Sequence, residues 1–153
     1  MIEVVTDNRN RAVAEIRHIL SRNGGNMADA GSVSWQFNRA AYFSFPLGSH
    51  DQDKIFELAV DAGADDVVFD EDTVEITGPV EAFRTISEGL GKAHIHPDEA
   101  GLRMLPKNEM DLEPDATIQV MRTIESLEDL DDVQDVFSNL NISEEALAKL
   151  EAE

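Results

Sequence analysis

Short strand-like runs alternate with segments of helical periodicity along the whole chain, and this alternation most constrains the fold. β-Branched and aromatic residues gather in the short runs, as is typical of strands. Between these runs, apolar residues recur every three or four positions, which is typical of amphipathic helices. The order reads βαβ, then αββαβ, then βαβ. It predicts an α+β fold in which helices cover the faces of sheets.

The first helix is the best defined of these segments. In "NRNRAVAEIRHILSRNGG", residues 8–25, Val13, Ile16 and Leu20 make an apolar stripe at spacings of three and four. Asp7 or Asn8 can cap its start, because a short polar side chain accepts hydrogen bonds from the first free N–H groups. Glycines 24 and 25 can end it in a left-handed turn.

The two outer βαβ units predict one domain and the middle run predicts another. The outer units can close into a split sheet of the ferredoxin-like kind. We therefore expect two ferredoxin-like α/β domains, the second inserted into the first. The expected boundaries are residues 1–48 plus 107–142 for the split βαβ-βαβ domain, 49–106 for the inserted α/β domain, and 143–153 for an acidic C-terminal tail or helix.

Charge is spread unevenly along the chain. There are 12 basic and 32 acidic residues, for a net charge of −20. Five arginines and four acidic residues lie within residues 1–50, which leaves seven basic and 28 acidic residues, or −21, in residues 51–153. So acidic a surface repels nucleic acid over most of its area. Contact with a polyanion must use the first 50 residues or a segment outside this chain; the alternative is a plain acidic surface adapted to salt.

The sequence offers little for catalysis or metal binding. The absence of cysteine excludes disulfides and thiolate sites and fits a reducing cytoplasm. His94 and His96 in "HIHPDE" have a ligand-like spacing, but a loop between a helix and a strand is ordinarily polar. Ser32 and Ser34 lack the surroundings of a nucleophile. We predict no catalytic residue, no metal and no cofactor. No apolar run is long enough to predict a membrane span.

A basic cluster at the start of the first helix is the strongest candidate site. "DNRNR" stands at a strand-to-helix junction, where free N–H groups and the helix dipole favour an anion. Arginine and asparagine side chains can bond phosphate, sugar or base edges. The candidate nucleic-acid-binding residues are Asn8, Arg9, Asn10, Arg11, Arg17, Arg22 and Asn26. The alternative is that these arginines neutralise the protein's own carboxylates.

The stretch that follows, "NGGNMADAGSVSWQF" (residues 23–37), predicts a rigid exposed loop beside these arginines. Glycine is the least costly residue at positive φ, so Gly24 and Gly25 can stop the helix. We expect a turn at Gly31 to direct Trp35 and Phe37 inward. A rigid loop beside positive charge suits docking on a partner, and equally suits a mere corner of the fold.

Three blocks carry a family resemblance: "TDNRNRAVAEIRHILSRNGGNMADAGSVSWQF", "MLPKNEMDL" and "LEDLDDVQDVFSNLNI". They resemble the YebC/PmpR family, which includes bacterial proteins described as transcriptional regulators and a mitochondrial translational activator of a cytochrome oxidase subunit. The resemblance implies three domains, with a lysine-rich helical domain ahead of two α/β domains. This chain begins where the second domain would begin. The resemblance therefore implies that nucleic-acid contact is made mainly through a segment absent here.

The resemblance implies a non-enzymatic, cytoplasmic regulator of gene expression. It would be a DNA-binding transcriptional regulator, a ribosome-associated translation factor, or both. Its partners would be DNA or ribosomal RNA, with a basic ribosomal protein as a further candidate, and no membrane. The alternative is an acidic protein-interaction module that docks on a basic partner, while the absent N-terminal domain binds nucleic acid. A small-molecule sensor is a third hypothesis, by analogy of fold alone.

Overall fold

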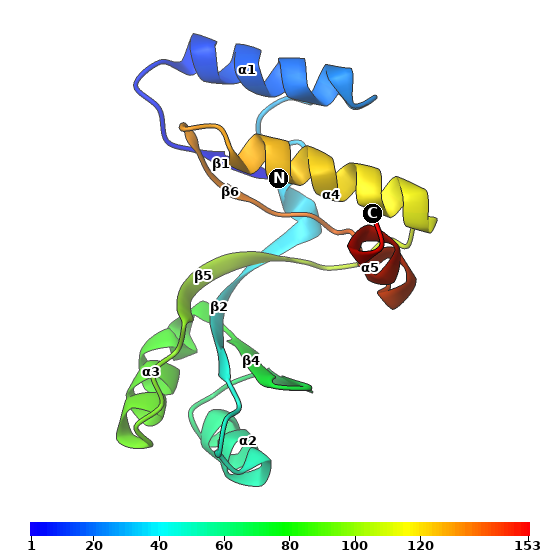
Figure 1. Ribbon diagram of the computed structural model, residues 1–153. Helices are drawn as coiled ribbons and strands as arrows, with labels where there is room; N and C mark the ends of the chain where they lie inside the picture. Colours follow the sequence, from blue (N-terminus) through cyan, green and yellow to red (C-terminus); the bar gives the residue numbers. More distant parts are fainter. The chain divides into compact units, whose positions relative to one another are not determined.

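The computed structural model describes residues 1–153 and shows a mixed α/β fold (Figure 1). The chain divides into two compact units. Unit 1 contains Met1–Phe37 and Pro106–Glu153, and unit 2 contains residues 38–105. None of the helices combines the length and the apolar character that crossing a bilayer requires.

Unit 1 is built from a two-stranded ribbon and three α-helices. Strand β1 (Ile2–Val4) pairs antiparallel with β6 (Val133–Val136), so that Ile2 lies opposite Val136. Helices α1 (Arg9–Arg22) and α4 (Pro114–Glu128) pack side by side, and α5 (Glu144–Glu151) packs on α4 (Figure 1). A short 3-10 helix, η1 (Ser34–Gln36), leads out of the loop after α1.

The core of unit 1 is small. Ile16 of α1, Leu127 of α4 and Val133 of β6 form its buried cluster, and Ile2 and Leu130 are among the partly buried residues around them. Of the apolar stripe that the sequence predicts for the first helix, Ile16 is buried in this cluster and Leu20 packs against it. The acidic C-terminal segment forms α5, whose Ala146 is fully buried and whose start is capped by a serine side chain.

Unit 2 is a four-stranded sheet with two helices. Its strands are β2 (Phe37–Pro46), β3 (Asp66–Asp70), β4 (Thr73–Gly78) and β5 (Glu99–Pro106), in the sheet order β3-β4-β2-β5. Strand β4 pairs antiparallel with both β2 and β3. Helix α2 (Gln52–Asp61) joins β2 to β3, and η2 (Val80–Ala82) with α3 (Phe83–Lys92) joins β4 to β5.

The core of unit 2 is larger and contains aromatic residues. Phe43 and Phe45 of β2 have almost no exposed surface and lie in one cluster with Ile76 of β4. The ring of Phe43 stacks on that of Phe83, with centroids 5.0 Å apart. Gly78 ends β4 at a close approach, because a Cβ there would meet Ile86 Cδ1 and a neighbouring Cα at 3.2 Å. The helices therefore pack directly on the sheet.

Strand β2 corrects the predicted outer domain. The prediction assigned it to a sheet shared with the first and last strands, but it pairs with β4 in unit 2. The physical reason is its buried face. Ala41, Phe43 and Phe45 occupy alternate positions on one side of the strand, and they are buried in the same cluster as the apolar residues of β4. The sheet of unit 1 therefore holds only β1 and β6. Residues 108–113 contribute only a single bridge, between Met110 and Leu140.

Candidate nucleic-acid interface

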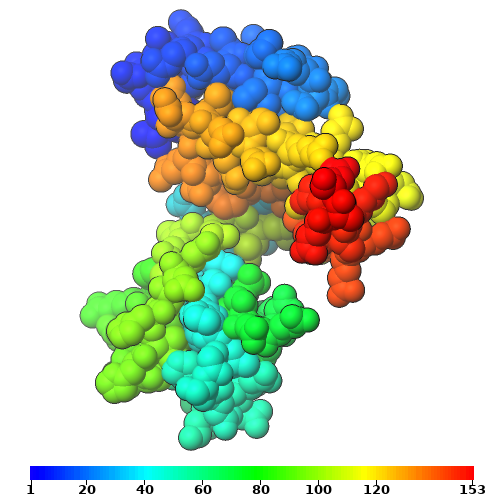
Figure 2. All heavy atoms as spheres, viewed as in Figure 1, coloured from blue at the N-terminus to red at the C-terminus, as the bar shows by residue number.

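The predicted site residues lie on α1 and in the loop that follows it, all within unit 1. Helix α1 lies on the outside of this unit, and Figure 2 shows its blue atoms against the yellow atoms of α4. All seven candidate residues are exposed: Asn8, Arg9, Asn10, Arg11, Arg17, Arg22 and Asn26. Two of them form hydrogen bonds that cap α1 or link it to the rest of unit 1, and the arginines among the others take part in no ion pair of this unit.

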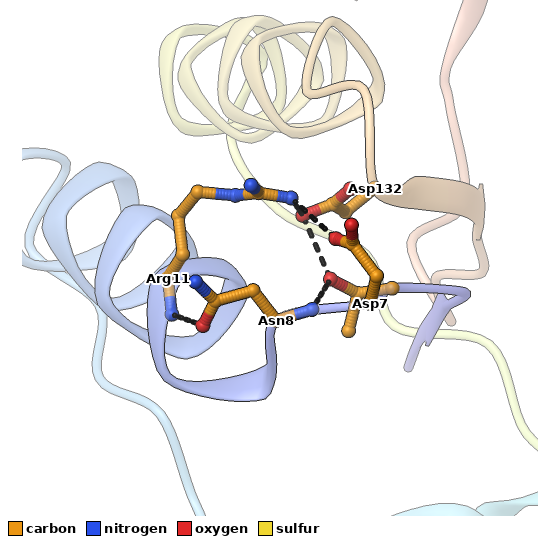
Figure 3. Close-up of polar contacts among 5 residues, drawn as sticks. Asp7, Asn8, Arg11 and Asp132 are labelled. Carbon is orange, nitrogen blue, oxygen red and sulfur yellow. Dashed lines mark hydrogen bonds and ion pairs between the residues drawn. The ribbon is translucent and has the colours of Figure 1, made fainter.

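The junction between β1 and α1 is closed by the protein's own carboxylates (Figure 3). Asn8 caps the helix, since its Oδ1 accepts a hydrogen bond from the backbone N–H of Arg11 at 3.1 Å. Arg11 Nη2 donates to Asp132 Oδ2 at 2.8 Å and to Asp7 Oδ1 at 3.2 Å. The Arg11 side chain is thereby tied both to its own junction and to the turn between α4 and β6.

Asp132 binds the Arg11 guanidinium, one of the groups that the sequence predicts to bind an external anion. Its side chain is 14% exposed, and it also accepts a hydrogen bond from Thr6 Oγ1 at 3.0 Å. The bonds from Arg11 and Thr6 lower the pKa of Asp132, and the same carboxylate raises the pKa of Arg11. Asn8 and Arg11 therefore have a structural role in unit 1, and their part in nucleic-acid binding stays a prediction.

We expect Asp132→Asn to lower the stability of unit 1 at neutral pH and to flatten its response to acid. A carboxylate whose folded-state pKa is depressed stabilises the fold above its unfolded pKa of about 3.9, and that contribution is lost as pH falls through the folded value. Urea unfolding of both proteins from neutral to acidic pH measures the effect. The gap between the two midpoints should close in acid.

Asp135→Asn is the matched control, because Asp135 is exposed on β6 outside the junction. It removes the same charge without removing the bonds to Arg11 and Thr6. If Asp132→Asn and Asp135→Asn shift the midpoint equally at every pH, the junction contributes nothing beyond net charge.

Arg9, Arg17 and Arg22 are exposed and take part in none of the ion pairs of unit 1. They do not share one face, however. An α-helix turns about 100° per residue, which places Arg17 about 140° around the axis from Arg22. Arg17 instead lies two turns beyond Asn10 on the same side. The cations therefore lie on two sides of α1.

Arg22 lies at the rim of a groove where α1 ends. The groove has a volume of about 270 Å³ and is lined by Ile19, Arg22, Asn23 and Ser126. Beside it, Gln119 Nε2 donates to the backbone carbonyl of Asn23 at 3.3 Å. The helix stops because Gly24 takes φ +79° and Gly25 N–H bonds back to the Leu20 carbonyl at 2.8 Å. Arg22 thus stands where the chain passes from the helix into the exposed loop that contains Asn26.

Trp35 is exposed, with 68% of its surface accessible, whereas Phe37 is buried at 8%. The prediction that both point inward is therefore wrong for the tryptophan. A strand would place residues 35 and 37 on the same face, but residues 34–36 form the 3-10 helix η1, which breaks the alternation and turns Trp35 outward. Sequence reasoning also missed Lys107, whose N–H bonds to the Gln36 carbonyl at 2.8 Å.

Charge is separated within unit 1. Residues 1–37 carry four arginines and four acidic residues and are neutral, whereas residues 106–153 carry three basic and 14 acidic residues, a net −11. The acidic residues lie mainly on α4, β6, α5 and the turns between them. A polyanion therefore meets the least repulsion along α1 and the loop after it.

Known proteins resemble this chain over nearly all of its length. The family model described as "TACO1/YebC second and third domain" matches residues 1–140. A "probable transcriptional regulatory protein" of Acidithiobacillus ferrooxidans is 40% identical over 99% of this chain and 60% of the relative. Proteins of the same description from Geotalea uraniireducens and Syntrophus aciditrophicus are 39% and 41% identical over 98% and 99% of this chain and 60% and 61% of their own lengths.

A solved structure shares the fold. The crystal structure of a conserved hypothetical protein, Aq1575, from Aquifex aeolicus superposes with a TM-score of 0.85 at 32% identity, over 94% of this chain and 60% of that one. The chain thus spans about 60% of the length of the relatives that it matches. These comparisons confirm the resemblance read from the three sequence blocks.

Proposed function

The chain belongs to the TACO1/YebC family, and from that premise we propose that it is a non-enzymatic, cytoplasmic regulator of gene expression that binds nucleic acid through α1 and the following loop. The observation that carries the proposal is the set of exposed arginines without ion-pair partners in unit 1, Arg9, Arg17 and Arg22. They stand on the neutral side of a strongly acidic chain. The printed descriptions of the relatives, as probable transcriptional regulatory proteins, support a regulatory role.

The chemistry of this surface suits phosphate binding. Guanidinium groups bond phosphate oxygens without reading sequence, so they position a partner rather than select a site. Asn10 adds an amide on the side of Arg17, and Asn26 adds one in the loop beyond Arg22. Double-stranded DNA and ribosomal RNA present the same backbone chemistry, so only binding measurements with each can separate them. A basic protein partner is less favoured, because the groups of this surface that are free to bind are cations.

The test replaces Arg9, Arg17 and Arg22 together with glutamate. Every phosphate that the variant no longer neutralises should reduce the salt dependence of binding by about one unit of log–log slope, and affinity should fall at least about tenfold at low salt. Binding of labelled DNA by fluorescence anisotropy and co-sedimentation with ribosomes are the two measurements. A decrease in only one of them identifies the target.

The matched control replaces Lys54, Arg84 and Lys92 with glutamate. These residues are exposed on α2, α3 and the end of α3 in unit 2, and the net charge changes by the same amount. If both triple variants weaken association equally, general charge repulsion explains the effect. If the α1 variant folds and associates like the parent protein with DNA and with ribosomes, the proposal fails.

We also propose that residues 38–105 are a ferredoxin-like domain inserted into the domain formed by the two outer segments. The element order β-α-β-β-α-β from β2 to β5 supports this, because it is the order of that motif. The sheet order β3-β4-β2-β5 agrees with a split arrangement in which the first and last strands are neighbours. Helices α2 and α3 then cover one sheet face, as their shared core indicates.

A further inference from the structure

Trp35 is a large aromatic side chain held rigidly in solvent. Its only hydrogen-bond donor, Nε1–H, is bound to the Ser32 carbonyl at 2.9 Å. The turn beneath it is fixed as well, since Gly31 takes φ +80° and its carbonyl accepts a bond from Ser34 Oγ at 2.9 Å. With its polar edge engaged inside the protein and 68% of its surface exposed, the ring presents apolar surface, including its π-system, to a partner.

The loop that carries Trp35 is open and contains little negative charge. Residues 24–33 are all exposed, and they are mostly small: glycine, alanine, asparagine and serine. Between Asn23 and Gln36 the only ionised side chain is Asp29. Arg22 precedes this loop, and Lys107 is held next to Gln36 by the backbone bond at 2.8 Å. An exposed aromatic ring therefore stands on an open loop that follows one cation in the sequence and ends beside another, in a chain of net charge −20.

We propose that Trp35 is a stacking platform for an unpaired base of single-stranded nucleic acid, with Lys107 and Arg22 near the flanking phosphates. This inference rests on the proposed function and narrows its partner. Aromatic side chains stack on bases whose faces are free, and in a duplex those faces are covered by neighbouring base pairs. Lysine and arginine at the two ends of the loop can then contact the backbone of the strand.

A protein partner fits this surface less well. The partner that a chain of −20 attracts is basic, and a basic partner would be drawn to the acidic helices α4 and α5 and repelled by Arg22 and Lys107. The exposed side chains of Met27 and Val33, at 37% and 40%, are smaller apolar groups along the same loop. They can pack against a base or a sugar on either side of the stacked position.

Trp35 is the only tryptophan of the chain, so its fluorescence reports on this position alone. The experiment titrates the protein at low salt with a labelled oligoribonucleotide, the oligodeoxyribonucleotide of the same sequence, and the duplex of each. The two single strands separate RNA from DNA as the source of the base. The expected result is quenching of tryptophan emission by at least one single strand and little quenching by either duplex.

Two variants complete the experiment. Trp35→Ala should weaken single-strand binding about tenfold, a value within the range of base–aromatic stacking, while Trp35→Phe should retain most of the affinity. Because the side chain is exposed, neither variant should shift the midpoint of urea unfolding appreciably. That readout separates the removal of stacking from damage to the fold.

Several results would overturn the inference. One such result is single-strand binding that is detected by anisotropy but leaves tryptophan emission unchanged, with Trp35→Ala binding as tightly as the parent protein. If the triple arginine variant loses that binding, the proposed function stands and only the stacking role fails. Equal quenching by strand and duplex would also contradict it. The inference would also fail if Trp35→Ala lost binding to a protein partner but kept its binding to the oligonucleotides. It would fail as well if the parent protein bound none of the oligonucleotides.

Discussion

Replacing Phe43 with alanine is expected to destabilise unit 2 by about 3–5 kcal/mol, the range for deleting a fully buried phenylalanine. Phe43 has no exposed surface and stacks on Phe83, so its removal leaves a cavity between the sheet and α3 and also reduces apolar burial. Chemical denaturation followed by amide hydrogen exchange measures the effect. Exchange should accelerate throughout residues 38–105.

The control is Phe56→Ala, which removes the same side chain from α2, where it is 52% exposed. Its cost should be a small fraction of that of Phe43→Ala, because half of the ring already contacts solvent. A Phe43→Ala variant that loses less than about 1 kcal/mol would show that the core of unit 2 collapses to fill the space.

Leu127→Ala is expected to destabilise unit 1 by about 2–5 kcal/mol. Leu127 is 3% exposed and lies between Ile16 of α1 and Val133 of β6 in a cluster with few fully buried members. Because this cluster has only three buried members, losing one leucine removes a large share of its buried apolar surface. Amide exchange should accelerate in residues 1–37 and 106–153 and change little in unit 2.

Leu147→Ala provides the comparison on α5, where the side chain is 43% exposed. If it costs as much as Leu127→Ala, the cluster around Ile16 is not the principal core of unit 1. If instead Leu127→Ala accelerates exchange equally in both units, the two units unfold together rather than separately.

Local patterns predicted the elements well. The spacing of Val13, Ile16 and Leu20 indicated α1, and Asn8, one of the two predicted capping residues, caps its start. These features depend on residues within a turn or two of one another. The family likewise could be recognised from three blocks of sequence, and the comparison with known proteins confirms it.

Features that depend on distant residues were not predictable in the same way. The partner of Arg11 is Asp132, 121 positions away, and nothing in "DNRNR" indicates which carboxylate will fill the junction. Trp35 points outward because residues 34–36 form η1 instead of a strand. The three side chains of this segment, serine, tryptophan and glutamine, do not indicate a 3-10 helix by themselves. Strand β2 belongs to the sheet of unit 2 because it pairs with β4, which is well separated from it in the sequence. Hydrophobic periodicity identifies a strand but does not indicate its pairing partner.

The bond between Lys107 and Gln36 has a consequence for the architecture of the chain. The polypeptide leaves unit 1 after Phe37 and returns at Pro106, and the flanking residues 36 and 107 are joined by one backbone hydrogen bond of 2.8 Å. Exit and return are therefore neighbours, the geometry that tolerates insertion and removal of whole domains. A short turn that joins Phe37 directly to Pro106 would leave unit 1 as a continuous domain. The removed segment, residues 38–105, could be inserted into a loop of another protein.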